Sequence, residues 1–215
     1  MYRKKYIPFT CLIILAFLFG CQSQQASDRE DGDLDDTFLE HSEENHRKTI
    51  EQTKTLAEEL EEDGWSAQNV SNGDIPDCYN FQPRRGSVDN YLKVHVGSGT
   101  DVALKLMHLK SDKCIRFVFI NSGSTYEINR IPEGKYYLKI AYGKDWYSKV
   151  ENDQCIGKFS RQPLYEKGTD ILDFNVQHQA DGYSIPSYAL SLDVVTTSPL
   201  NSFSSKGISE ADFNE

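Results

Sequence analysis

The sequence predicts a mainly β protein: an antiparallel β-sandwich of about seven strands, preceded by a disordered acidic linker and one short helix. Two observations support this prediction. Residues 78–215 contain short segments in which apolar and polar side chains alternate, with turn sequences between most of them, as in half-buried strands. Residues 22–64 instead hold 15 acidic and 4 basic side chains, a net charge of −11, and few apolar ones.

The first twenty residues have the pattern of an export signal. Three basic residues at positions 3–5 precede an apolar run over residues 7–19. As a helix, this run would extend for about 20 Å, which is shorter than the roughly 30 Å hydrocarbon core of a membrane. A basic start followed by an apolar run of this length is typical of a cleaved signal peptide. We therefore predict a signal over residues 1–20 rather than a transmembrane helix.

The end of the apolar run, Leu18-Phe19-Gly20-Cys21, resembles the lipobox of bacterial lipoproteins, and polar residues 22–25 follow it as in that family. The resemblance implies that Cys21 is lipidated and becomes the first residue of the mature protein. It also implies an outer-membrane lipoprotein of the bacterial cell envelope, periplasmic or surface-exposed and bound to the membrane through its N-terminal lipid. An ordinary signal peptide, or an uncleaved anchor with an incidental cysteine, is the alternative.

The segment between the signal and the sandwich divides into three parts. Residues 21–40 are predicted to be an acidic disordered tether, because low hydrophobicity and repulsion between like charges oppose collapse. Residues 41–63 place apolar side chains on one narrow stripe and end before Gly64, which predicts an amphipathic helix or spacer. Residues 64–77 are rich in Ser, Asn, Gly, Asp and Pro and are predicted to form a loop.

Seven segments after this loop are predicted strands. They are residues 91–96, 101–107, 115–120, 125–131, 135–142, 170–177 and 187–196. The arrangement Ile131-Pro132-x-Gly134-x-Tyr136-x-Leu138 resembles prealbumin-like and carboxypeptidase-regulatory-like β-sandwiches. More broadly, residues 90–213 resemble an uncharacterised bacterial C-terminal β domain. The resemblance implies the fold, and no functional residue carries over from it.

Three cysteines follow the tether: Cys78, Cys114 and Cys155. An exported protein can keep disulfides, and three cysteines allow one bridge in three pairings. We expect Cys114–Cys155 first, because both cysteines precede short apolar runs and could lie at neighbouring strand ends. Cys78 is the alternative partner in such a bridge. The other possibility is that the cysteines are free buried thiols. Spacings of about 40 residues without a Cys-x-x-Cys pair do not indicate a metal site.

No motif in the sequence indicates catalysis or a cofactor. A Gly-x-Ser-x-Gly elbow and a P-loop are both missing, and the histidines in strand patterns lack a carboxylate at an informative spacing. Residues 65–215 carry a net charge of −2 beside the −11 of the preceding segment, which is not the basic footprint of a nucleic-acid-binding protein. We therefore predict no catalytic residue, no metal, no cofactor and no nucleic-acid partner.

Five aromatic residues between positions 136 and 147 suggest a binding surface. Alternation places Tyr136 and Tyr142 in the core, which leaves Tyr137, Trp146 and Tyr147 as candidates for an exposed face, unless these rings also pack in the core and turns. The sequence thus predicts a lipid-anchored envelope protein with a non-catalytic module that binds an envelope protein or glycan. A hydrolase with residues dispersed over strand ends and a structural or assembly subunit are the alternatives.

Overall fold

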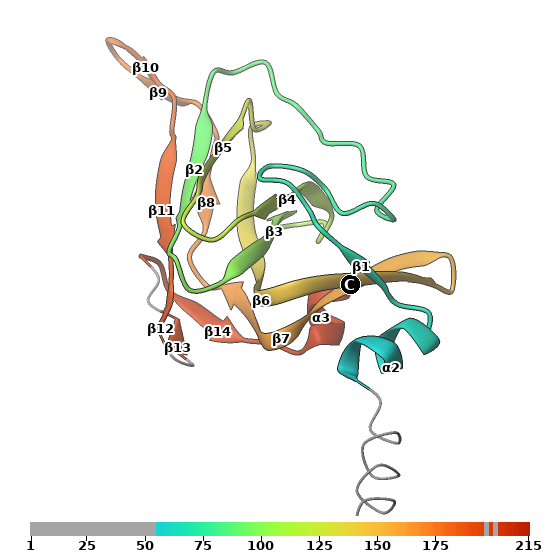
Figure 1. The fold of residues 1–215 in the computed structure, drawn as a ribbon. Coiled ribbons are helices and arrows are strands. Elements are labelled where there is room, and N and C mark those ends of the chain that lie inside the picture. Colours follow the sequence, from blue (N-terminus) through green and yellow to red (C-terminus); the bar gives the residue numbers. More distant parts are fainter. Residues whose placement is uncertain (1–54, 196–197, 200–201) are drawn as a thin grey trace, which may run out of the picture. The chain divides into compact units, whose positions relative to one another are not determined.

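The computed structural model describes residues 55–195, 198–199 and 202–215. The predicted signal, the lipidation of Cys21, the acidic tether and residues 41–54 of the predicted helix lie outside the described residues. Within them the mainly β fold is confirmed, because strands dominate and only two short helices occur (Figure 1). No helix of the described part combines the length and apolar character needed to cross a membrane.

The larger sheet contains seven strands, and every pair in it is antiparallel. Its main path has the order β14-β7-β6-β3-β4. Off this path, β8 pairs with the first two residues of the long strand β6, and β1 pairs with residues 146–148 of it. The strands are β1 (Ser66–Gln68), β3 (Asp101–His108), β4 (Cys114–Ile120), β6 (Lys135–Glu151), β7 (Gln154–Gly168), β8 (Leu172–Asp173) and β14 (Ser205–Gly207).

The smaller sheet has the order β11-β2-β5, with β2 (Tyr91–Val96), β5 (Thr125–Asn129) and β11 (Tyr188–Leu192). β2 and β5 are antiparallel, whereas β11 and β2 are parallel, so the sandwich is not wholly antiparallel as predicted. Two short pairs complete the strands. They are β9 (Gln177–Gln179) with β10 (Gly182–Ser184), which project beyond the sheets in Figure 1, and β12 (Val194–Val195) with β13 (Ser198–Pro199).

Two apolar clusters lie on the two faces of the larger sheet. The inner cluster fills the space between the sheets, and the alternation in β2 turns Leu92, Val94 and Val96 into it. The outer cluster lies on the opposite face, under residues 70–81 and the C-terminal helix, and includes Phe117, Trp146, Phe159 and Phe213. Both faces of β3 and β6 are therefore covered, which explains their nearly continuous apolar sequences.

Two capped helices flank the sheets. In α2 (Leu56–Glu62), the side chain of Thr55 accepts a hydrogen bond from the backbone N–H of Glu58, whose side chain accepts one from the backbone of Thr55. Helix α2 ends before Gly64, as predicted, and Gly64 has a φ of +82°. Helix α3 (Glu210–Asn214) has the same capping arrangement at Ser209 and was not predicted.

Several predicted boundaries differ from the structure. The predicted loop over residues 64–77 contains β1, whose backbone pairs with β6. The predicted strand over residues 170–177 is divided between β8 and β9. β6 continues far beyond residue 142, because a register shift at Gly143 bends the strand without ending its pairing with β7. β7 itself was not predicted, since Gly157 and Pro163 interrupt its pattern.

Candidate functional site

Four lysines form one row across four neighbouring strands of the larger sheet. Lys105 on β3 is directly opposite Lys139 on β6. Lys167 on β7 is directly opposite both Lys139 and Lys206 on β14. Directly opposite residues share one face of a sheet, so the four side chains leave the same face. Because neighbouring strands lie about 4.8 Å apart, this lysine row extends for about 14 Å.

The C-terminal helix α3 covers Lys105 and Lys139, the two lysines of the row that lie on the central strands β3 and β6. The ammonium group of Lys105 donates a hydrogen bond to the carbonyl oxygen of Phe213 at 2.7 Å, and that of Lys139 donates one to the carbonyl oxygen of Asp212. Only 6% of Lys105 and 8% of Lys139 is exposed. The last carbonyl groups of a helix have no partner within the helix and form the negative end of its dipole, so they stabilise these two cations.

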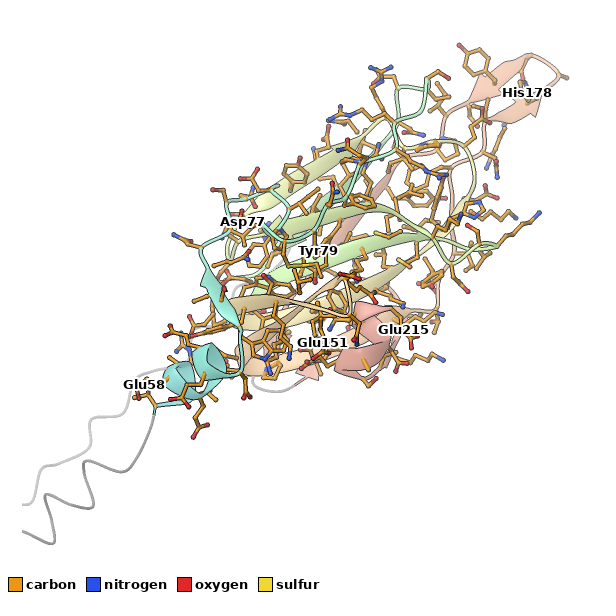
Figure 2. The ribbon with its side chains drawn as sticks, turned by 90° about the vertical axis from the view of Figure 1, so that its right-hand side faces the viewer. Glu58, Asp77, Tyr79, Glu151, His178 and Glu215 are labelled. Carbon is orange, nitrogen blue, oxygen red and sulfur yellow. A yellow bond between two sulfur atoms is a disulfide. The ribbon has the colours of Figure 1, made fainter. Side chains whose placement is uncertain are left out.

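Aromatic rings surround the ammonium group of Lys105. Its nitrogen lies 4.6 Å from the ring centre of Phe213, 5.5 Å from that of Phe117 and 5.9 Å from that of Tyr79. In Figure 2 the viewer looks at the side of the molecule on which Tyr79 and Glu215 are labelled. Burial lowers the pKa of Lys105 to about 8, and the charge of Lys139 acts in the same direction, whereas Cys114 opposes the decrease.

The other two lysines of the row, on β7 and β14, are more open to solvent. Lys206 is exposed, and half-buried Lys167 lies with its ammonium nitrogen 4.1 Å from the ring centre of Tyr137. A cavity of about 320 Å³ lies here. The polar side chains that line it are Asp112, Tyr137, Lys139, Lys167, Lys206, Asp212 and Glu215.

Two of the three acidic side chains that line this cavity, Asp112 and Asp212, accept hydrogen bonds from neutral groups, and the third is Glu215. Asp112 accepts a hydrogen bond from the Tyr137 hydroxyl at 3.1 Å, while burial and this bond raise the pKa of Tyr137 to about 12. Asp212 accepts hydrogen bonds from Ser209, which lower its pKa together with the charges of nearby lysines. Among the described residues, no carboxylate lies at ion-pair distance from any ammonium group of the row.

This geometry is suited to binding negative charge. Like charges directly opposite each other in a sheet destabilise it, so folding alone does not favour a row of four lysines. An extended polyanion would offset this repulsion. The cavity lining contains no cysteine, serine or histidine that could act as a nucleophile or as the usual general base. Within the described residues, no three His, Cys, Asp or Glu side chains are grouped as metal ligands.

The three candidate aromatic residues do not form an exposed surface, and the alternative interpretation, that these rings pack in the core and turns, agrees with the structure. Tyr137, Trp146 and Tyr147 are 3%, 2% and 7% exposed. Trp146 packs against Phe159 with ring centres 4.9 Å apart, and its indole N–H has no hydrogen-bond partner among the described residues. Tyr147 packs in a separate cluster beneath α2. The extended β6 is covered on both faces, which the alternation alone did not indicate. Tyr137 still borders the lysine row.

The expected Cys114–Cys155 bridge is wrong, because Cys155 is bonded to the alternative partner Cys78, with Cα atoms 5.6 Å apart. Cys114 is a free thiol on β4, and strands β3 and β6 lie between β4 and β7 in the sheet. Its Sγ lies 3.1 Å from the carbonyl oxygen of Arg116. Burial raises the pKa of Cys114 to about 11, so the thiol is protonated at neutral pH.

Sequence reasoning did not find the lysine row. Its one visible signal is that two of the lysines, Lys105 and Lys139, interrupt otherwise apolar strand segments. No protein-family model, curated protein or solved structure matches this chain.

Lys105 is expected to make the free energy of unfolding rise between about pH 8 and its ordinary pKa of 10.5. The unfolded chain keeps this proton throughout the interval, whereas the folded protein releases it near pH 8, so the unfolded state binds more protons and stability increases with pH. The increase should approach about 1 kcal/mol per pH unit. Urea unfolding from pH 7 to pH 10 measures it.

The matched comparison replaces Lys105 by Met in a Cys114→Ser background. Cys114 contributes with the opposite sign above its ordinary pKa of 9.0, because its pKa is raised in the folded state. The Lys105→Met protein should lack the rise that the Cys114→Ser protein shows. Identical pH slopes for the two proteins would show that Lys105 has an ordinary pKa.

Proposed function

We propose that this chain is a lipid-anchored protein of the bacterial cell envelope whose β-sandwich is a non-catalytic module that binds a polyanionic partner. The lipobox-like sequence before Cys21 and the acidic segment after it support the anchor and the tether. The lysine row supports the binding role, through the single observation that four lysines are in register on four neighbouring strands. The partner is an acidic glycan or an acidic protein segment of the envelope.

The position of the row explains how an acidic chain would bind an anion. Residues 65–215 have a net charge of −2, so the chain as a whole does not attract polyanions. The four ammonium groups concentrate positive charge locally. Because Lys105 and Lys139 are buried, solvent screens their charges less. A partner would therefore be attracted to one edge of the outer face, and the affinity should fall as salt is added.

Replacing the two accessible lysines of the row is expected to weaken polyanion binding about tenfold. The variant is Lys167→Gln/Lys206→Gln in the full chain, and the probes are dextran sulfate, polyglutamate and neutral dextran in a titration at low salt. Each accessible charge contributes up to about 1 kcal/mol, and 1.4 kcal/mol is a factor of ten in affinity. Dextran sulfate and polyglutamate distinguish the glycan from the protein partner, and neutral dextran should not bind.

The control is Lys93→Gln/Lys135→Gln, which removes the same charge elsewhere. Lys93 pairs with Glu127 at 3.3 Å, and Lys135 pairs with Asp173 at 3.2 Å, both with exposed side chains. This control should bind dextran sulfate nearly as the original protein does. An equal loss of affinity in both variants, or no binding of either polyanion by the original protein, would contradict the proposed role of the row.

The Cys21→Ala substitution is expected to abolish acylation and to move the protein from the membrane fraction to the soluble fraction. Each lipid methylene that enters the membrane contributes about 0.8 kcal/mol, so loss of the acyl chains removes the attachment. Labelling of cells with a clickable fatty acid, followed by fractionation, measures both effects. Cys114→Ser is the matched control and should keep the label. Membrane retention of the Cys21→Ala protein would contradict the anchor.

A further inference from the structure

A second cavity, of about 210 Å³, lies at the edge of the sandwich beside β4. Residues 73–85 of the segment before β2 form one side of it, and β4 and β5 form the other. Two arginines line the cavity, Arg85 and Arg116, together with one acidic side chain, Glu127. The lysine row borders a different cavity, so the two sites share no lining residue.

Arg116 is a buried cation without a partner of opposite charge. It is 5% exposed. Its Nη1 donates to the carbonyl oxygen of Ile115 at 2.9 Å and its Nη2 to that of Arg130 at 3.2 Å, and both acceptors are neutral. In the described part of the chain, no carboxylate lies at ion-pair distance from its guanidinium group. A buried charge without a counter-ion is costly, so an anion that approached Arg116 would be stabilising.

A β-bulge sets the direction of Arg116. Leu106 is opposite Arg116 and Met107 is opposite Cys114, so Ile115 is an extra residue in β4. Bulges of this kind redirect side chains next to binding sites. Because Leu106 belongs to the inner cluster, Arg116 leaves the inner face of the larger sheet, at the edge strand where the sandwich opens.

The backbone around Arg85 is tied to the same two carbonyl groups that Arg116 uses. The N–H of Arg84 donates to the carbonyl oxygen of Ile115 at 3.2 Å, and the N–H of Gly86 donates to that of Arg130 at 2.7 Å. A side chain at Gly86 would place its Cβ 2.8 Å from the Cα of Pro132, so glycine permits this close approach. Arg85 is therefore held between two fixed points at the cavity that contains Arg116.

The one acidic side chain at the cavity is paired elsewhere. Glu127 forms an ion pair with Lys93 of β2 at 3.3 Å. The two arginines thus face the cavity without neutralisation by the described protein. Guanidinium groups bind oxygen anions through parallel N–H donors, and the geometry of a phosphate, sulfate or carboxylate matches this arrangement.

We propose that this arginine cavity binds a single oxyanion, the phosphate, sulfate or carboxylate group of a small ligand, between the guanidinium groups of Arg116 and Arg85. The volume of about 210 Å³ is below the roughly 300 Å³ at which pockets for drug-sized ligands begin, so one small anion or one anionic end of a ligand fits. This site is separate from the polyanion site and does not depend on it.

The test uses the full chain with inorganic phosphate, sulfate or acetate as the probe, each against chloride at the same ionic strength. A bound anion stabilises the folded state by RT ln(1 + c/Kd), where c is the anion concentration, so the rise of the melting temperature with anion concentration yields a dissociation constant. We expect one of the three oxyanions to stabilise the protein beyond chloride and to shift the amide signals of Gly86 and Tyr126 in a two-dimensional NMR spectrum. Equal melting temperatures in all four salts would overturn the proposal.

Two variants locate the binding. Arg85→Gln, an exposed position, should weaken the best oxyanion at least tenfold. Arg116→Lys keeps the charge but loses the parallel donors, and should weaken it similarly if the variant folds. Arg161→Gln, at an exposed arginine on β7 that pairs with Asp145, should leave the dissociation constant unchanged. An unchanged constant in Arg85→Gln, or a tenfold loss in Lys167→Gln/Lys206→Gln instead, would overturn the proposed site.

Discussion

Removal of the Cys78–Cys155 disulfide is expected to lower the free energy of unfolding by about 4 kcal/mol. The two cysteines are 77 residues apart, so the bridge closes a long loop and restricts the unfolded chain strongly. In the folded protein it joins the segment that precedes β2 to the start of β7. That segment carries Tyr79 and Phe81, which pack on the outer cluster. Without the bridge, the cover of the outer face is held by packing and a few hydrogen bonds.

Urea unfolding of Cys78→Ser/Cys155→Ser measures this effect, with Cys114→Ser as the control. Cys114 is free in the structure, so its replacement should keep the bridge and most of the stability. A reducing agent should destabilise the original protein and the control, and should leave the double variant unchanged. A peptide map that shows Cys114 linked to another cysteine, or a double variant as stable as the original, would contradict the assigned pairing.

The Gly143→Ala substitution is expected to lower the free energy of unfolding by about 3 kcal/mol, at the upper end of the range for overpacked cores. Gly143 lies where the pairing of β6 with β7 shifts register, and its φ is +157°. An added Cβ would lie 2.3 Å from the Cβ of Phe159 and 2.9 Å from the carbonyl oxygen of Arg161. Phe159 is 1% exposed in the outer cluster, so it has no space to move aside.

Thermal unfolding provides the measurement for Gly143→Ala. A chain of this size loses about 2–4 °C per kcal/mol, so the melting temperature should fall by about 10 °C. The control is Gly207→Ala in β14, where an added Cβ would have no neighbour within 4 Å. That variant should remain within about 0.5 kcal/mol of the original, as surface substitutions usually do. Equal melting temperatures for the two variants would contradict the bulge at Gly143.

Several strands were predicted from the sequence, including residues 101–107 and 115–120, which lie within β3 and β4. Residues 91–96 were predicted with the bounds that the structure shows, because β2 buries every second side chain. The sequence left open whether Tyr137, Trp146 and Tyr147 are exposed or packed, and they are buried because residues 70–81, α2 and α3 cover parts of the outward face of β6. The alternation of apolar and polar residues within a strand does not show whether segments distant in the sequence cover one of its faces.

The candidate sites depend on register, which a single sequence does not contain. Lys105 and Lys167 are 62 positions apart, yet both are aligned with Lys139 through three neighbouring strands. Lys105 and Lys139 each interrupt an apolar segment, but this pattern does not show that the four lysines are neighbours. Arg116 is similar, because its burial follows from a bulge that adds one residue to β4. The pairing of Cys78 with Cys155 also depends on where the segment before β2 crosses the sheet.

Lysine acetylation footprinting of the full chain, with and without dextran sulfate, tests the polyanion site most directly. Mass spectrometry would follow the modification rates of Lys167 and Lys206, with Lys93 and Lys135 as internal references on exposed side chains. We predict that dextran sulfate slows acetylation of Lys167 and Lys206 severalfold and leaves the two references unchanged. Equal rates with and without the polyanion, or equal protection of all four lysines, would contradict a specific role for the lysine row.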